Sequence, residues 1–181
     1  MNTYESIALT RDCEAVQIPS GTLVSLPAGT MVRITQSLGG TYTVITDSGN
    51  MVRIGARDAD ALGEKVGEAP ATPPVGETDL EKVVWDQLRT VYDPEIPVNV
   101  VELGLVYECA LTPVPKGGHS AYVRMTLTAP GCGMGPILIA EAEQKLRALP
   151  SLVDVQVELV LDPPWHPGLM SEAARLELGF F

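Results

Sequence analysis

A proline- and glycine-rich segment at residues 64–77 (EKVGEAPATPPVGE) constrains the fold most, because the hydrophobic patterns on its two sides differ. Proline cannot donate to a backbone ladder and glycine is costly to order, so this composition is typical of a semi-extended linker. We therefore expect a small N-terminal domain at residues 1–63 and a second domain at residues 78–181.

The N-terminal part alternates apolar and polar residues in short runs that proline, glycine and asparagine turns separate. A period of two with such punctuation is typical of antiparallel β structure. We expect a small all-β domain, either a barrel or a sandwich, with strands at residues 23–26, 32–35, 42–45 and 51–54.

The second part begins with a helical pattern, for which Thr78 and Glu81 form a capping box. Two strands are expected over residues 100–111 and 121–128, and a loop with two prolines and two glycines between them favours antiparallel pairing.

A helix after Pro136, a strand over residues 153–160 and a last helix from Ser171 complete the second part. Strand, helix and strand in this order imply a right-handed crossover and parallel pairing. The sequence therefore predicts an α+β domain in the order α-β-β-α-β-α, with a small mixed three-stranded sheet.

The composition excludes several classes of function. Hydrophobic residues make up 45% and charged residues 19%, as in globular proteins. The net charge of −11 disfavours binding to nucleic acid and to anionic membranes, and it suits docking onto basic protein surfaces. No apolar run reaches about 18 residues, so we expect no membrane span.

The three cysteines, Cys13, Cys109 and Cys132, lie far apart in the sequence. An odd and widely spaced set is not typical of a secreted disulfide framework. The first residues also lack a basic segment followed by an apolar stretch, so we expect no signal peptide. These features favour a cytoplasmic protein with free thiols.

Cys132 is the strongest candidate for chemistry, within residues 128–135 (TAPGCGMG). It follows a predicted strand and precedes a predicted helix, where backbone N–H groups and the helix dipole favour a thiolate. Gly131, Gly133 and Gly135 would leave the sulfur open to a partner or a metal. The alternative is a small apolar residue that fills a tight turn.

Two further loops have functional side chains. In residues 93–99 (DPEIPVN), prolines would hold the carboxylates of Asp93 and Glu95 for a metal or a partner; alternatively, these acids are simply solvated.

Residues 162–167 (DPPWHP) leave the last strand at the edge where Cys132 lies, if the pairing is parallel. There, Asp162 begins the loop, and Trp165 would either shield the thiol or anchor the terminal helix. His166 would be a base or a ligand, or an ordinary surface residue.

Several catalytic motifs are absent from the sequence. No CxxC, HExxH or pair of histidines at metal spacing occurs, which disfavours an autonomous zinc or four-cysteine site. The phosphate-binding GxxxxGK[ST] motif is also absent. A Cys–His nucleophile pair would have to use His166, because His119 is expected at the opposite end of the strand that precedes Cys132.

Four stretches, taken together in this order, resemble a known family: residues 93–99, 102–107 (ELGLVY), 128–135 and 162–165. They look like the small domain shared by SufT-type iron–sulfur assembly proteins, eukaryotic cytosolic cluster-targeting factors and PaaD-like proteins. Residues 170–175 resemble the C-terminal segment of this family. The N-terminal part resembles an extension of SufT proteins, and the extra cysteines of PaaD-like proteins are absent, so the resemblance favours SufT.

The resemblance implies a non-catalytic maturation factor that helps to deliver iron–sulfur clusters to client proteins. The key cysteine of the family falls on Cys132 and its acidic motif on Asp93 and Glu95. One thiolate cannot supply the four ligands of a cluster. Any cluster would therefore be held transiently, with further ligands from a second copy in a homodimer, a scaffold or carrier protein, a client or a small thiol. The alternatives are a thiol enzyme that uses Cys132 and His166, and an adaptor that only docks proteins.

Overall fold

The computed structural model describes residues 6–63 and 80–180, which fall into two compact units, residues 1–71 and 72–181. The predicted linker at residues 64–77 and the predicted helix cap at Thr78 lie outside the described residues. The exact domain boundaries therefore stay a prediction, and each unit is described by itself.

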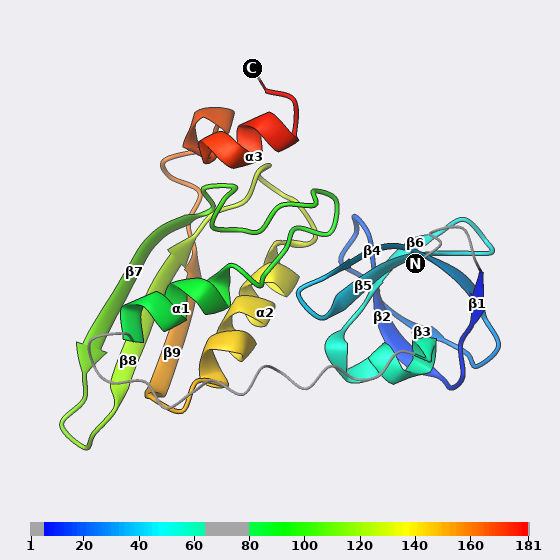
Figure 1. Ribbon diagram of the computed structural model, residues 1–181, viewed down its shortest axis with the longest axis horizontal. Helices are drawn as coiled ribbons and strands as arrows, with labels where there is room; N and C mark the ends of the chain where they lie inside the picture. The colour runs from blue at the N-terminus through cyan, green and yellow to red at the C-terminus, as the bar shows by residue number, and fades with distance from the viewer. Residues whose placement is uncertain (1–5, 64–79, 181) are drawn as a thin grey trace. The chain divides into compact units, whose positions relative to one another are not determined.

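The first unit is a single curled antiparallel sheet of six strands in the order β1-β4-β5-β6-β2-β3 (Figure 1). The alternating runs predicted four of these strands, and the single sheet means that the sandwich alternative is wrong. The short strands β1 and β2 and the 3-10 helix η1 were not predicted. The elements are β1 (Ile7–Ala8), β2 (Cys13–Gln17), β3 (Leu23–Leu26), β4 (Met31–Leu38), β5 (Thr41–Thr46), β6 (Met51–Ile54) and η1 (Ala56–Leu62).

The core of the first unit lies on one face of this sheet. Val32, Val44 and Ile54 are fully buried there, and Leu62 of η1 packs in the same cluster. Alternation along the strands produces this face, because every second side chain points to the same side.

The second unit is an α+β domain with a mixed sheet in the order β7-β8-β9, as the sequence predicts. β7 and β8 pair antiparallel, whereas β8 and β9 pair parallel and α2 crosses between them. The elements are α1 (Leu80–Leu88), β7 (Val106–Pro113), β8 (His119–Met125), α2 (Gly135–Arg147), β9 (Leu152–Leu159), η3 (Pro167–Leu169) and α3 (Glu172–Glu177).

α1 and α2 cover one face of this sheet (Figure 1). The core between the layers combines the apolar side of each helix with alternate residues of β8. The opposite face of the sheet is polar, and Tyr122 there donates a hydrogen bond to Glu158. The core residues include Val84, Leu88, Ala121, Val123, Met125, Leu138, Ala142 and Leu146.

The prediction of a strand from residue 100 is wrong over residues 100–105, which form a turn before β7. The Asn99 side chain explains the turn, because its Oδ1 accepts hydrogen bonds from the N–H groups of Val101 (3.1 Å) and Glu102 (3.0 Å). Gly104 then adopts a left-handed φ of 70°. Such local side-chain bonds compete with a strand ladder.

Strand register brings three loops to one edge of the second unit. Met125 at the end of β8 pairs with Val106 at the start of β7 and with Leu159 at the end of β9. The loops before β7, after β8 and after β9 therefore leave the sheet together. His119 pairs with Pro113 and Leu152 at the opposite edge, as predicted.

Gly104 offers a test of how this edge is packed. A Cβ there would lie 2.2 Å from the Leu169 carbonyl oxygen, whereas a Cβ at Gly117, which has a φ of 92°, would meet open space. We expect Gly117→Ala to cost about 1–2 kcal/mol through φ strain alone, and Gly104→Ala to cost more than about 3 kcal/mol.

Urea unfolding of the full chain, followed by tryptophan fluorescence, would measure both losses. Both tryptophans, Trp85 and Trp165, belong to the second unit, so the signal reports on that unit. Equal losses for the two variants would contradict the close approach of Gly104 to Leu169.

Candidate functional site

Cys132 lies in a closed turn between β8 and α2. Its N–H donates to the Ala129 carbonyl (3.3 Å), and its own carbonyl accepts a hydrogen bond from the N–H of Gly135 (3.1 Å). The side chain is half-buried and packs against the core of the second unit. The thiol is therefore held at the edge where the three loops leave the sheet.

The N-terminus of α2 differs from the expected anion site. Gly135 donates its N–H to Cys132, Pro136 has no N–H, and the next two N–H groups both donate to the Met134 carbonyl, at 3.1 and 3.0 Å. The N–H groups of Gly135, Ile137 and Leu138 are therefore already used within the turn and the helix, which leaves fewer helix N–H groups for a thiolate than expected.

The glycines around Cys132 have separate tasks. Gly131 is exposed with a φ of 81° and open space around its Cα, so it supplies the left-handed turn. Gly133 is half-buried within the same turn. A Cβ on Gly135 would lie 2.6 Å from Leu127 Cδ1, so this glycine allows α2 to approach the sheet closely. Only part of the predicted opening around the sulfur therefore comes from the glycines.

Asp93 shapes the acidic loop before β7. Its side chain is 6% exposed, and its Oδ1 accepts hydrogen bonds from the N–H groups of Glu95 (2.9 Å) and Ile96 (3.2 Å). The expectation of a solvated acid is thus wrong for Asp93. Glu95 is exposed at the loop surface and is the carboxylate that a partner can reach.

The DPPW loop anchors the segment that leads to α3. Trp165 donates from Nε1 to the Leu103 carbonyl (2.8 Å), and Tyr107 donates its hydroxyl to the Pro163 carbonyl (2.9 Å). The ELGLVY and DPPW motifs therefore meet, although they lie more than fifty residues apart in the sequence. Of the two roles considered for Trp165, this geometry fits anchoring.

Asp162 and His166 lie on either side of this anchor, and both are exposed. His166 precedes η3, whereas Cys132 precedes α2. Among the described residues, no hydrogen bond joins these two side chains. The structure thus brings both to the same sheet edge without pairing them.

Sequence reasoning missed the residues that receive the anchor. Leu103 and Gly104 were read as part of a strand, yet the first supplies the carbonyl for Trp165 and the second lies against Leu169. One signal was present, because an isolated glycine within a predicted strand, here Gly104, indicates a bulge or a close approach of another backbone segment.

The other two cysteines are held as neutral thiols. Burial raises the pKa of Cys13 in β2, and burial beside Glu81 raises the pKa of Cys109 to about 11. Since the thiolate is the nucleophile and the metal ligand, neither thiol is suited to metal chemistry near neutral pH.

Among residues 6–63 and 80–180, no group of three or more histidine, cysteine, aspartate or glutamate side chains could hold a metal ion. Within the same residues, no helix is long and apolar enough to cross a membrane.

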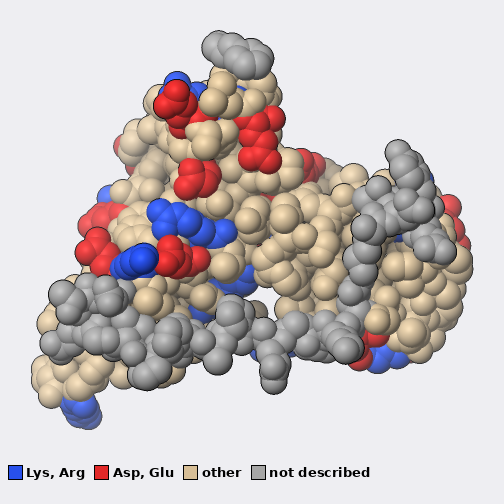
Figure 2. Space-filling view, viewed as in Figure 1, with Lys and Arg blue, Asp and Glu red and all other residues tan. Residues whose placement is uncertain are grey.

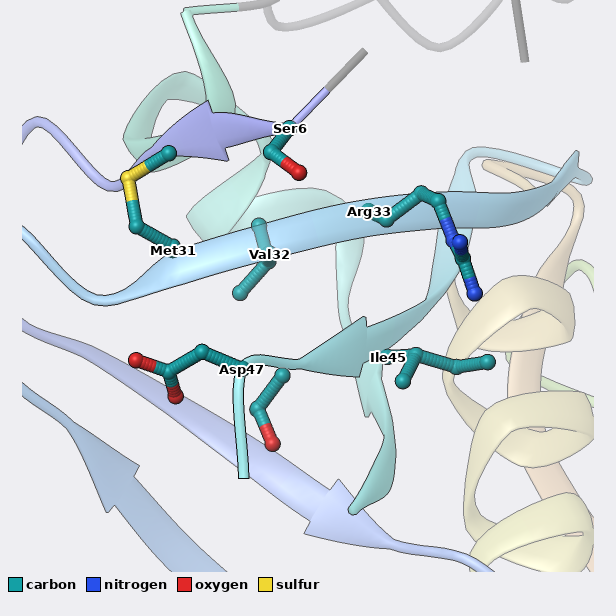
Figure 3. Close-up of a pocket in the computed structure, with 7 residues that line it drawn as sticks. Ser6, Met31, Val32, Arg33, Ile45 and Asp47 are labelled. Carbon is teal, nitrogen blue, oxygen red and sulfur yellow. The ribbon is translucent and has the colours of Figure 1, made fainter. Parts of the chain in front are cut away.

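The first unit has a shallow hollow of about 200 Å³ between β1, β4 and β5 (Figure 3). Arg33 and Asp47 supply its charges, and neither a cysteine nor a histidine reaches it. Its lining therefore offers no reactive side chain comparable with the Cys132 thiol in the turn between β8 and α2. The lining residues are Ser6, Met31, Val32, Arg33, Ile45, Thr46 and Asp47.

Comparison with known proteins assigns the family. The model of the family described as "Iron-sulfur cluster assembly protein" matches residues 81–159, which include Cys132 and the acidic loop. An "Fe-S protein maturation auxiliary factor" from Porphyromonas gingivalis is 43% identical over 101 residues, which cover 55% of this chain and 91% of that protein. The chain belongs to the iron–sulfur cluster assembly family.

Two further relatives agree with this assignment. The auxiliary factor YitW from Bacillus subtilis is 37% identical over 103 residues, covering 57% of this chain and 97% of the relative. The auxiliary factor SufT from Staphylococcus aureus is 40% identical over 89 residues, covering 49% of this chain and 97% of the relative. The SufT-type resemblance is therefore confirmed.

The lengths of these relatives also show whether they contain a unit like the N-terminal one. Because 89 residues cover 97% of the Staphylococcus aureus protein, that relative has no room for a further unit of the size of residues 1–71. The first unit is thus an addition to the part that these relatives share.

The environments of the three cysteines predict an order of alkylation. At pH 8, a thiol with a pKa of about 11 is ionised in roughly one molecule in a thousand. We expect iodoacetamide to modify Cys132 first in the native chain, and Cys13 and Cys109 only after denaturation. Peptide mass spectrometry over a time course would measure the order. Equal rates for Cys109 and Cys132 would contradict it.

Proposed function

We propose that this protein assists the delivery of iron–sulfur clusters to client proteins, and that the Cys132 thiol is its point of contact with the cluster. Membership of the iron–sulfur cluster assembly family supports the general role. One observation supports the role of Cys132: its turn lies at the sheet edge to which the strand register brings the other motif loops.

The cluster is then a cargo rather than a resident cofactor. A cluster needs four ligands, and Cys132 offers one. Among the described residues, no group of three or more metal-binding side chains could supply the other ligands. Further ligands therefore come from the donor or the acceptor protein, and contact lasts only while one of them is bound.

The surface near this edge suits docking of basic partners. Acidic side chains gather over α3, which has Glu172 and Glu177 (Figure 2). Glu95 adds an exposed carboxylate on the loop before β7. Complementary charge speeds encounter with a basic protein surface. Scaffold or carrier proteins and apo client proteins are the partners that this function requires.

The rival function is a thiol enzyme in which His166 activates Cys132. A nucleophile and its base lie within hydrogen-bond reach of each other in most such sites, although the contact can be loose without substrate. The anchor formed by Trp165 and Leu103 supports a separate position for His166, because it fixes the residue that precedes the histidine.

Complementation separates the two functions. In a strain without its own copy of the gene, we expect Cys132→Ser to leave client iron–sulfur enzyme activity at the level of the deletion, and His166→Ala to restore it as the wild type does. The reverse ranking would support the enzyme.

Cys109→Ser is the matched control for the loss of a thiol, and we expect it to restore activity. Immunoblots of each variant would verify equal protein levels. Full rescue by Cys132→Ser would refute the role of the thiol and favour an adaptor that only docks proteins.

A further inference from the structure

The chain after β9 is attached to the second unit at one place. Residues 161–180, which we call the C-terminal strap, run from the end of β9 to α3, beyond the end of the sheet (Figure 1). Just before the strap, Val160 donates its N–H to the Met125 carbonyl at the end of β8 (2.8 Å). The strap therefore begins where the bonding between β8 and β9 ends.

The attachment is made by residues 102–107 (ELGLVY), which we call the platform. Within the described part of the chain, three hydrogen bonds join the strap to the rest of the second unit, and all three reach the platform. They run from the Ser171 N–H to the Glu102 carbonyl (2.9 Å), from Trp165 Nε1 to the Leu103 carbonyl (2.8 Å) and from the Tyr107 hydroxyl to the Pro163 carbonyl (2.9 Å).

Packing places the strap on the same platform. The Leu169 carbonyl oxygen approaches Gly104 so closely that a Cβ there would lie 2.2 Å from it. Both kinds of contact thus depend on the shape of one short stretch of chain.

Few apolar side chains of the strap are buried. Met170 and Ala174 are buried in the core of the second unit, whereas Trp165 and Leu178 are half-buried. In contrast, α2 buries one residue in nearly every turn, from Gly135 to Leu146. Segments with few buried apolar contacts open at a lower free energy than the core does.

The length of α3 makes this opening cooperative. The helix has six residues, and isolated helices shorter than about 12 residues are marginal in water. Its hydrogen bonds, from Arg175 to Ser171 and from Leu178 to Ala174 (both 3.0 Å), therefore persist only while the strap is docked. The contacts with the platform and the helix itself should form and break together.

We propose that the C-terminal strap opens as one unit on an intact sheet, with the platform as its latch. In the open state α3 unfolds, and the carbonyl groups of Glu102 and Leu103 become accessible. Cys132 stays in place, because its backbone bonds to Ala129 and Gly135, which lie outside the strap. The strap thus covers and uncovers part of the edge at which Cys132 lies. This motion needs no cluster, so it does not depend on the proposed function.

Hydrogen exchange followed by NMR on the full chain tests whether the strap is one unit. We expect the N–H groups of Ser171, Arg175 and Leu178 to share one protection factor, since a single opening exposes all three. This factor should be at least about tenfold lower than that of N–H groups in the centre of α2.

Trp165→Phe tests the latch, because it removes one bond to the platform and retains an aromatic ring. We expect the shared protection factor of the strap to fall at least about fivefold, the factor expected for the loss of one hydrogen bond. Exchange within α2 should not change.

Tyr107→Phe tests the latch from the platform, since Tyr107 does not belong to the strap. We expect the strap to exchange about twofold faster or more, a smaller effect because this hydrogen bond is exposed. Tyr122→Phe is the matched control, because its hydroxyl donates an exposed hydrogen bond to Glu158, on the polar face of the sheet. It should leave the strap unchanged.

Equal protection of the strap and of α2 would overturn the proposal, because the strap would then open only with the whole unit. Unrelated protection factors for Ser171, Arg175 and Leu178 would overturn it as well, since they indicate fraying from one end. An effect of Tyr122→Phe equal to that of Tyr107→Phe would refute the platform as the latch. Circular dichroism would verify that each variant folds.

Discussion

The parallel pairing of β8 with β9 is the interaction on which the architecture of the second unit depends. An antiparallel return would have needed only a tight turn, and it would have sent the end of β9 to the opposite edge. Parallel pairing requires a crossover, which α2 provides, and α2 covers the sheet as it crosses. Both strands then end together at Met125 and Leu159. For this reason, the turn that holds Cys132 and the loop at residues 162–167 leave the same end of the sheet.

Much of this arrangement was predictable, because the strands of both units follow a period of two and the helices a period near 3.6. The mixed sheet, the edge shared by Cys132 and the DPPW loop, and the distant position of His119 all followed from strand direction. The error over residues 100–105 has a local cause: an apolar run resembles a strand until the Asn99 side chain bonds to the backbone that follows it. Hydropathy contains no information on that competition.

The roles of individual site residues were harder to predict than their location. Asp93 and Trp165 belong to motifs that the family resemblance selected, yet one shapes its own loop and the other anchors the segment before α3. A motif shows that residues matter without separating those that touch a partner from those that position a loop. The N-terminal unit illustrates the same limit, since it suggested SufT while the SufT relative matches only about half of the chain.

The hydrogen bonds of the Cys132 backbone have a mechanical consequence. Because both its N–H and its carbonyl are used within the turn, the backbone of this residue has little freedom of its own. In a cysteine, only rotation about the Cα–Cβ bond moves the sulfur relative to the backbone, so the sulfur can occupy only a few nearby positions. In the proposed function, a metal centre would therefore have to come to this thiol. The donor and the acceptor of the cluster would then bind and leave in turn, while the Cys132 sulfur stays in place.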